Sequence, residues 1–313
     1  MFVISSHSMN LYRQLETVNF DNFTVVTIGN FDGLHIGHKK IIDKVVDLSN
    51  KYNFEPVLFT FNNHPLKFFG ADIELIMPEE KKIEMIFNLG IRHIISVDFT
   101  KDVANMDPDL FVREILVKKL NAKYIVVGYD YRFGKKRKGD FQLLNMLSMK
   151  YGFTAIKMDK VVIDNATVSS TNIRKLIKDG DIPLANKMLG REFEIEGVVK
   201  DGDNLGRLIG YPTANIKYAN FVVPKYGVYI TKTVIDDVEY PSVTNVGVRP
   251  TIKDKDELRV ETYILDFDKD IYNKIVTVKF LVYLREELKF ETFEDLKRKI
   301  DEDVKIAREY FNI

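Results

Sequence analysis

The fold of the first half of the chain is decided by one stretch, Val25-Val26-Thr27-Ile28-Gly29-Asn30-Phe31-Asp32-Gly33-Leu34-His35-Ile36-Gly37-His38. Its first four residues are apolar or β-branched, as in a buried strand, and its first two glycines predict a tight turn. Apolar residues then recur at helical spacing as far as Lys51. The stretch therefore predicts a strand, a glycine loop and a helix in direct succession.

The start of this helix is a predicted phosphate-binding site. The first amides of a helix lack backbone partners and carry the positive end of its dipole, so they favour an anion. His35 and His38 are three residues apart and share one helical face there. We interpret the site as a nucleoside triphosphate cradle with both histidines directed at the phosphates. Its ATP-binding candidates are Gly29, Phe31, Asp32, Gly33 and Gly37.

Two other readings of the histidine pair are weaker. Two surface histidines beside a turn are common, but two of the chain's five histidines at this spacing favour function. A zinc pair is disfavoured because the chain has no cysteine, and no third histidine or carboxylate cluster stands nearby to complete a ligand set.

Composition limits the classes of function. The 313 residues suffice for two domains with their own cores. With 46 basic and 46 acidic side chains the net charge is zero, so a nucleic-acid partner is not favoured. Zero cysteines exclude disulfides and thiolate chemistry. No apolar run approaches membrane-spanning length and the first ten residues lack a long apolar core, so we expect a cytoplasmic protein without membrane contact.

The remainder of the first half alternates apolar strands with helical patterns, including a helix over 108–120, which predicts a parallel sheet covered on both faces. Ligands of such sheets bind beyond the carboxyl ends of the strands, where the strand order reverses. A loop expected at that edge, residues 128–134, offers Gly128, Asp130 for a ribose hydroxyl and Arg132 for an anion. A plain loop with solvated charges is the alternative, and it is the better explanation of the basic run at 135–138.

A second helix start, Val168-Ser169-Ser170-Thr171-Asn172-Ile173-Arg174, has the character of a phosphate site. Ser170 and Thr171 offer hydroxyls, and Arg174 adds a guanidinium in the first turn. An ordinary helix cap with a solvated arginine is the alternative reading.

The second half changes from helical to alternating periodicity. Four segments, 194–200, 228–235, 258–267 and 274–284, read as strands without helices between them, and 291–311 reads as an amphipathic helix. We therefore predict a small antiparallel β-barrel closed by a terminal helix.

The candidate phosphate-binding residues of the second half lie in a glycine-rich loop before the second of these strands. It carries Gly202, Gly206, Arg207 and Gly210, which suit a loop curled around phosphates, and a β-bulge loop is the alternative. Thr213 and Asn215 present neutral oxygens that suit Mg²⁺ beside phosphate. No histidine lies in this half, so a base has to be a carboxylate such as Glu261, unless that residue is a solvent-facing strand charge.

Motifs across the chain resemble the bacterial bifunctional riboflavin kinase/FAD synthetase family. TIGNFDGLHIGHKK, VVGYDYRFG and VSSTNIRKL resemble its FMN adenylyltransferase domain, and GRLIGYPTAN, PKYGVY, TNVGVRPTI and VETYILDF its kinase module. The resemblance implies a Rossmann-like nucleotidyltransferase domain over 1–186 and a riboflavin kinase barrel over 187–313. It implies riboflavin, FMN and ATP as substrates with Mg²⁺. We also expect a monomer or weak homo-oligomer.

The resemblance also implies roles for single residues. Glu261 would activate the ribityl hydroxyl, Thr213 and Asn215 would hold Mg–ATP, and Gly206 with Arg207 would cover the phosphates. His35, His38 and Arg174 would stabilise the departing pyrophosphate, while Asn62 and Arg285 would contact flavin.

Two other classes of function stay open at this stage. The tetrapeptide His35-Ile36-Gly37-His38 also occurs in class I aminoacyl-tRNA synthetases and other adenylyl-transferring relatives, which leaves a tRNA- or cytidyl-type transferase as the rival enzyme. A flavin-sensing or RNA-binding module without catalysis is the rival non-enzyme.

Overall fold

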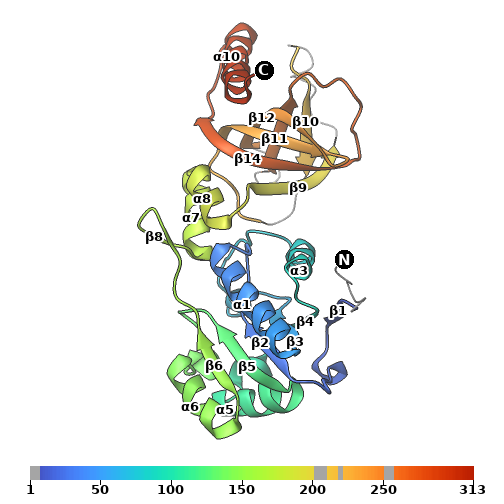
Figure 1. Ribbon diagram of the computed structural model, residues 1–313. Helices are drawn as coiled ribbons and strands as arrows, with labels where there is room; N and C mark the ends of the chain where they lie inside the picture. The colour runs from blue at the N-terminus through green and yellow to red at the C-terminus, as the bar shows by residue number, and fades with distance from the viewer. Residues whose placement is uncertain (1–7, 201–209, 218–220, 250–256) are drawn as a thin grey trace. The chain divides into compact units, whose positions relative to one another are not determined.

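A computed structural model describes residues 8–200, 210–217, 221–249 and 257–313, and Figure 1 gives its element labels. Contacts divide the chain into two compact units, Met1–Ser170 and Thr171–Ile313, here called the sheet unit and the barrel unit. The expected domain boundary at 186/187 stays a prediction.

The sheet unit is built on six parallel strands, and the predicted parallel sheet is confirmed. Their order is β1-β4-β3-β2-β5-β6, so the direction of winding reverses between β2 and β5. This is the switch point at which such sheets bind ligands. The strands are β1 (Asn10–Tyr12), β2 (Thr24–Ile28), β3 (Glu55–Phe61), β4 (His93–Val97), β5 (Ala122–Val127) and β6 (Thr154–Lys157).

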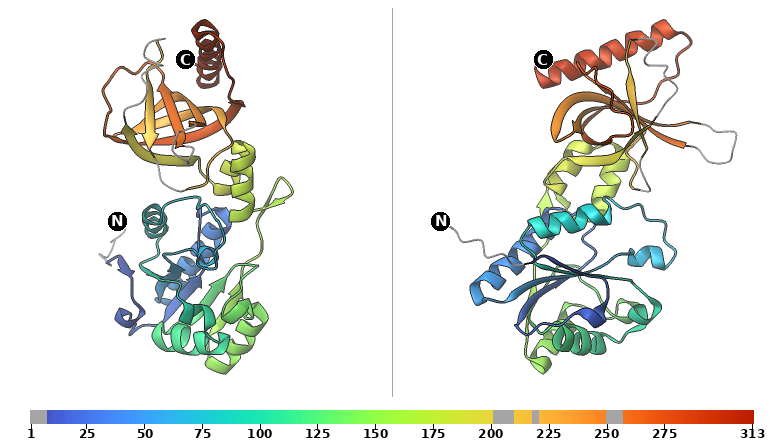
Figure 2. Two further views of the ribbon diagram at one scale, coloured as in Figure 1. Left: turned by 180° about the vertical axis from the view of Figure 1, so that it is seen from behind. Right: turned by 90° about the vertical axis from the view of Figure 1, so that its right-hand side faces the viewer.

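Helices cover both faces of this sheet, as Figure 2 shows. One core contains the apolar faces of α1 (Ile36–Tyr52) and α3 (Glu79–Asn88). The opposite core contains η2 (Phe111–Lys119) and α6 (Phe141–Tyr151). Burial on both sides explains the continuous apolar strands. Short helical segments complete the unit: η1 (Leu15–Thr17), α2 (Pro65–Phe68), α4 (Lys101–Asn105), α5 (Pro108–Leu110) and η3 (Lys135–Arg137).

The helix predicted over 108–120 differs in winding from the expectation. After α5 the chain continues as the π-helix η2, which ends with a hydrogen bond of 2.9 Å from Leu120 N to Ile115 O. Its buried residues Phe111, Val112 and Leu116 pack under the sheet. Side-chain periodicity located this helix but could not distinguish its backbone pairing from that of an α-helix.

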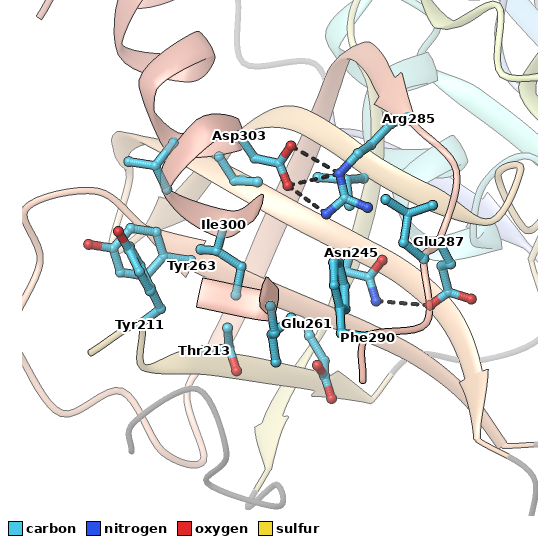
Figure 3. Close-up of a pocket in the computed structure, with 15 residues that line it drawn as sticks. Tyr211, Thr213, Asn245, Glu261, Tyr263, Arg285, Glu287, Phe290, Ile300 and Asp303 are labelled. Atoms are coloured by element: carbon cyan, nitrogen blue, oxygen red, sulfur yellow. Dashed lines mark hydrogen bonds and ion pairs between the residues drawn. The ribbon is translucent and has the colours of Figure 1, made fainter. Parts of the chain in front are cut away.

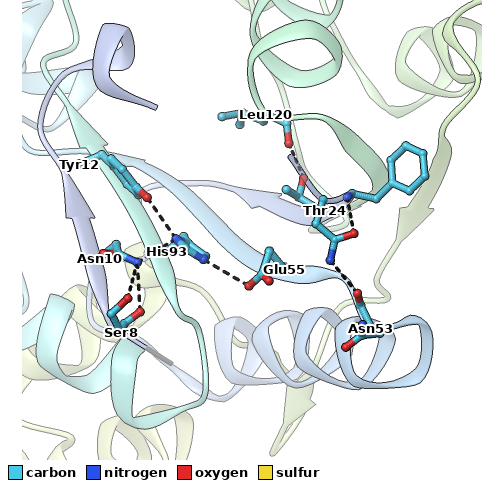
Figure 4. Close-up of polar contacts among 10 residues, drawn as sticks. Ser8, Asn10, Tyr12, Thr24, Asn53, Glu55, His93 and Leu120 are labelled. Carbon is cyan, nitrogen blue, oxygen red and sulfur yellow. Dashed lines mark hydrogen bonds and ion pairs between the residues drawn. The ribbon is translucent and has the colours of Figure 1, made fainter. Parts of the chain in front are cut away.

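His93 holds the edge strand β1, which the sequence did not reveal (Figure 4). Its Nδ1 lies 3.4 Å from both Asn10 Nδ2 and Tyr12 Oη, and its Nε2 lies 3.3 Å from Glu55 Oε2. Burial lowers the pKa of His93, although Glu55 opposes the shift. Because Glu55 and His93 begin their strands, this cluster lies at the amino-terminal edge of the sheet, away from the switch-point loops.

The barrel unit is a closed barrel of six antiparallel strands with a terminal helix, α10 (Phe293–Phe311), so the predicted barrel is confirmed. The sequence missed two of its strands, β10 and β12. In barrel order the strands are β10 (Thr213–Lys217), β13 (Glu257–Ile264), β12 (Val238–Arg249), β11 (Gly227–Ile235), β14 (Ile275–Arg285) and β9 (Phe193–Lys200). Four short elements precede the first barrel strand in the sequence: β7 (Val162–Ile163), β8 (Ala166–Thr167), α7 (Ser170–Asp179) and α8 (Ile182–Leu189).

The two faces of the barrel wall differ in character. One carries fully buried hydroxyls: Thr244 Oγ1 lies 2.7 Å from both Thr231 Oγ1 and Thr262 Oγ1. Since side chains alternate along a strand, Asn245 and Glu261 belong to the other face. That other face also carries Val243, which packs in one apolar cluster with Val304 and Ala307 of α10.

Among the described residues, no helix is both long and apolar enough to span a membrane.

Candidate active sites

The loop between β2 and α1 forms the predicted cradle at the switch point. Phe31, Gly33 and Leu34 have φ values of 53°, 76° and 37°, which turn the chain sharply into α1. Gly33 is required twice over: its φ favours glycine, and a Cβ there would lie 2.8 Å from Ile76 Cδ1. The loop is thus fixed in shape, and the amino end of α1 lies at the carboxyl end of β2.

His35 caps α1 and is stacked on His38. Its Nδ1 accepts a hydrogen bond of 3.2 Å from His38 N, and the two ring centroids are 3.6 Å apart at 15°. Because Nδ1 accepts, the ring proton of His35 is on Nε2. Gly37 allows this ring stacking, because a Cβ at Gly37 would lie only 3.2 Å from His35 Cε1 and Nδ1. Local backbone geometry therefore sets both the orientation and the tautomer of His35.

His38 is held neutral by its surroundings. Burial, followed by the nearby His35 and Lys82, keeps its pKa well below the ordinary value of 6.5. The Phe31 ring packs edge-on at 5.1 Å, and Phe31 itself is buried in the apolar core. Within the described part of the chain His38 Nδ1 has no hydrogen-bond partner although it is buried. A neutral imidazole with an unused nitrogen is available for a ligand.

The other predicted ATP contacts of this site differ in their burial and in their hydrogen-bond partners. Asp32 is 5% exposed and accepts from Ile76 N at 3.0 Å, and Ser170 Oγ donates to Asp32 O at 2.9 Å. Gly128 and the exposed Asp130 follow β5, next to β2, as expected. Arg132 Nη1, however, pairs with Asp140 Oδ2 at 3.0 Å.

Two more predicted contacts lie beyond the sheet unit. Thr171 and Arg174 are on α7, in the part of that helix that belongs to the barrel unit.

A small cavity of about 30 Å³ lies on the β3 side of the cradle. Asn62 follows β3 and lines it, and its buried Oδ1 has no hydrogen-bond partner among the described residues. His64 Nε2 lies 3.3 Å from Asn30 Nδ2. Lys82, which the sequence reading did not select, is 8% exposed and also lines this cavity.

The larger cavity, of about 230 Å³, lies in the barrel unit between the barrel wall, α10 and the segment before it (Figure 3). Thr213 and Glu261 lie along one edge of this cavity, whereas Arg285 and Asp303 lie along the other. Apolar side chains from the wall and from α10, including Val243, Ile300 and Val304, form much of the lining. The space can take a flat apolar group between two polar ends.

Cross-strand register places the polar residues of one edge together. Asn215 on β10 and Asn245 on β12 both pair with Glu261 on β13, while Thr213 pairs with Tyr263. Directly opposed residues of an antiparallel sheet share a face, so Thr213, Asn215 and Glu261 face the same side. Arg259 Nη1 donates to Glu261 Oε1 at 3.1 Å from two positions earlier on the strand. Glu261 lines the cavity, so the solvent-facing alternative does not describe its position.

The other edge depends on a buried ion pair between β14 and α10. Arg285 Nε donates to Asp303 at 3.0 Å and Nη2 donates at 2.6 Å, and the Asp303 side chain is 3% exposed. Asn245 Nδ2 donates to Glu287 Oε1 at 3.0 Å. The sequence reading missed Asp303, Asn245 and Glu287. Asp303 carried a signal: it is an acid on the apolar face of an amphipathic helix.

Most of the predicted kinase loop lies outside the described residues. Gly202, Gly206 and Arg207 lie outside the described residues, and Gly210, with a φ of 89°, is exposed. A group of three or more His, Cys, Asp or Glu side chains that could hold a metal is absent from the described residues.

A nucleotide-type loop on a parallel sheet and a carboxylate-lined cavity on a barrel define a two-module phosphate-transferring enzyme. The family model of FAD synthetase matches residues 18–172, and that of riboflavin kinase matches residues 189–311. The chain belongs to the bifunctional riboflavin kinase/FMN adenylyltransferase family. The predicted family and order of modules are thereby confirmed.

Individual relatives are similar over nearly the whole chain. The protein of that name from Buchnera aphidicola subsp. Acyrthosiphon pisum is 34% identical, covering 97% of this chain and 99% of its own. The one from Escherichia coli K12 is 34% identical over 92% of this chain and 93% of its own. A crystal structure from Streptococcus pneumoniae, titled a macrolide-efflux protein, has a TM-score of 0.88 and 29% identity, covering 96% and 98% of the two chains.

Proposed function

We propose that the chain converts riboflavin to FMN in its barrel unit and FMN to FAD in its sheet unit, with ATP as co-substrate of both steps. The observation that carries the first step is the cavity in which Glu261 and Thr213 line one edge and Arg285 the other. Two chemically different ends suit a substrate with a reacting hydroxyl at one end and an apolar ring.

In the kinase step, Glu261 accepts the proton of the ribityl hydroxyl as its oxygen attacks the γ-phosphorus of ATP, and ADP leaves. Arg259 keeps the carboxylate oriented through the hydrogen bond of 3.1 Å. Arg285, fixed by Asp303, donates to the flavin from the far edge of the cavity.

Mg²⁺ fits the donors of the kinase edge. Thr213 and Asn215 contribute a hydroxyl and an amide oxygen on one face, and Mg²⁺ commonly takes few protein oxygens together with phosphates and waters. When bound there, the ion would neutralise phosphate charge.

In the adenylyl step, a phosphate oxygen of FMN attacks the α-phosphorus of ATP, and pyrophosphate leaves. The positive amino end of α1 and the ring N–H groups of His35 and His38 stabilise the charge that develops on the pyrophosphate. The predicted roles of Arg174, Thr171, Gly128, Asp130 and Arg132 toward ATP, and of Asn62 toward flavin, stay part of this proposal, as do a cytoplasmic location and a monomeric or weakly oligomeric state.

The test is the product series. Incubation of the protein with riboflavin, Mg²⁺ and ATP, followed by chromatography, is expected to show FMN first and FAD later. Chemically reduced flavin and alternative divalent ions should be included, and a complete lack of flavin nucleotides under all of them would refute the proposal.

A further inference from the structure

Lys82 is a buried cation that the mechanism above does not use. It lies on α3 with 8% of its surface exposed. Within the part of the chain that the structure describes, its Nζ makes a single hydrogen bond, 3.3 Å to the carbonyl oxygen of Asn30. An ammonium group has three donors, and a lysine is rarely this buried without a charged partner. Two donors of Lys82 are therefore unused beside the cavity.

The two carboxylates that act on the charge of Lys82, Glu79 and Asp32, line the same cavity and accept hydrogen bonds from other groups. Glu79 Oε1 accepts from Ser96 Oγ at 2.6 Å and from Arg13 Nη1 at 2.5 Å. Asp32 accepts from Ile76 N with both oxygens, at 3.0 and 3.2 Å. Burial lowers the pKa of Lys82, and the two carboxylates only partly oppose that shift. A buried charge that lacks a direct ion pair gains most from an incoming anion.

The position of the cavity in the sheet indicates which anion this is. Along the strand order β3-β2-β5, the cradle follows β2, the predicted ribose loop follows β5, and the cavity borders the residues after β3. ATP running from the β5 side to the start of α1 leaves the β3 side for the second substrate. At about 30 Å³ the cavity suits a small polar group.

We propose that Lys82 binds the phosphate of FMN in the cavity on the β3 side of the cradle and holds it for attack on ATP. Asn62, whose amide NH₂ group is a hydrogen-bond donor, lines the same cavity. This inference rests on the proposed adenylyltransferase activity and adds a substrate-binding residue to it.

Two substitutions test the charge without creating a large cavity. Lys82→Met keeps the apolar stem, and Lys82→Gln also keeps a donor toward the Asn30 carbonyl. For both we expect the KM for FMN in FAD synthesis to rise about 10- to 100-fold, the range for a lost charge-assisted hydrogen bond. The KM for ATP should change less than about threefold, since the cradle is intact, and Lys82→Arg should recover most of the loss.

A second readout isolates the phosphate. In a Glu261→Gln background, in which we expect riboflavin phosphorylation to be about 10²–10⁴-fold slower, riboflavin is used as a competitive inhibitor against FMN. Its inhibition constant should stay unchanged in Lys82→Met, because riboflavin lacks the phosphate. Lys81→Met is the matched control: Lys81 is the preceding residue on α3, its side chain is 38% exposed, and it forms an ion pair with Glu84.

Each outcome decides the matter. Three results would overturn the role of Lys82. They are an unchanged KM for FMN in Lys82→Gln, an equal rise of the KM for FMN and the inhibition constant of riboflavin, and a rise of the KM for ATP alone. Far-ultraviolet circular dichroism and the kcat of FAD synthesis at saturating FMN report whether the sheet unit of each variant is folded. Wild-type protein that makes no FAD from FMN would refute the proposed function itself, whereas wild-type activity with indifferent Lys82 variants would refute only this inference.

Discussion

The two candidate sites are built in different ways. In the sheet unit, a single loop and the helix that follows it supply both histidines, and the cap of α1 orients them. In the barrel unit, the cavity takes its polar residues from several strands and from α10. A site made from neighbours in sequence can be recognised from a motif, whereas one made by cross-strand register has to be assembled by the fold. The two activities should accordingly respond to separate substitutions.

The largest expected effect is on the kinase. Glu261→Gln keeps the shape of the side chain but removes the base, so riboflavin phosphorylation should fall by about 10²–10⁴-fold. FAD synthesis from supplied FMN should stay within twofold of wild type, measured by chromatography of the flavin products. Equal losses in both assays would contradict the assignment of one reaction to each unit.

The reverse experiment uses His38→Ala. Loss of one donor to the developing phosphate charge should lower FAD synthesis by about 10²-fold. Riboflavin kinase activity should remain at the wild-type level, assayed with the same enzyme and ATP concentrations. If FAD synthesis persisted, the stacked histidine pair would be a structural cap alone.

Asp303→Ala probes the long-range construction of the kinase cavity. The change leaves the mostly buried guanidinium of Arg285 unpaired, so the barrel unit should lose about 3 kcal/mol of unfolding free energy. Hydrogen exchange of peptides from β14 and α10 during urea unfolding would measure it. The control is Arg308→Ala on α10, which removes an exposed ion pair with Asp266 from outside the helix and should cost less than about 1 kcal/mol. Equal losses of unfolding free energy in the two variants would show that the buried pair stabilises the barrel unit no more than the exposed pair does.

The smallest effect concerns acid. Since burial lowers the pKa of His38 below 6.5, the unfolded chain binds this proton at a higher pH than the folded chain does. Stability should therefore fall as the pH drops below 6.5, by no more than about 1.4 kcal/mol per pH unit for this group. His38→Gln should reduce the slope of unfolding free energy against pH, measured by urea titrations of the sheet unit between pH 7 and 5. His93 contributes equally to the wild type and the variant. Identical slopes would place His38 in a more solvated environment.

Prediction from the sequence succeeded where the signal was local. The strand, loop and helix from Val25 to Lys51 gave the cradle and its cap, and alternating periodicity gave the barrel. It failed for β1, which is three residues long, and for β12, in which Pro241 and Gly247 break the alternating pattern of side chains. Lys82 was missed because it looks like an ordinary charge on an amphipathic helix until its burial is known, whereas Asp303 was missed although it is an acid on the apolar face of its helix.

The sequence by itself determined the family, the two modules in order, and the residue types for phosphate chemistry, because short motifs encode loops and caps through local backbone preferences. Only the tertiary structure decided that Glu261 faces a cavity beside Asn215 and Asn245, that Asp303 fixes Arg285, and that Lys82 is buried at the edge of the sheet. Strand register, helix docking and burial depend on contacts between distant residues, and no single stretch of the chain specifies them.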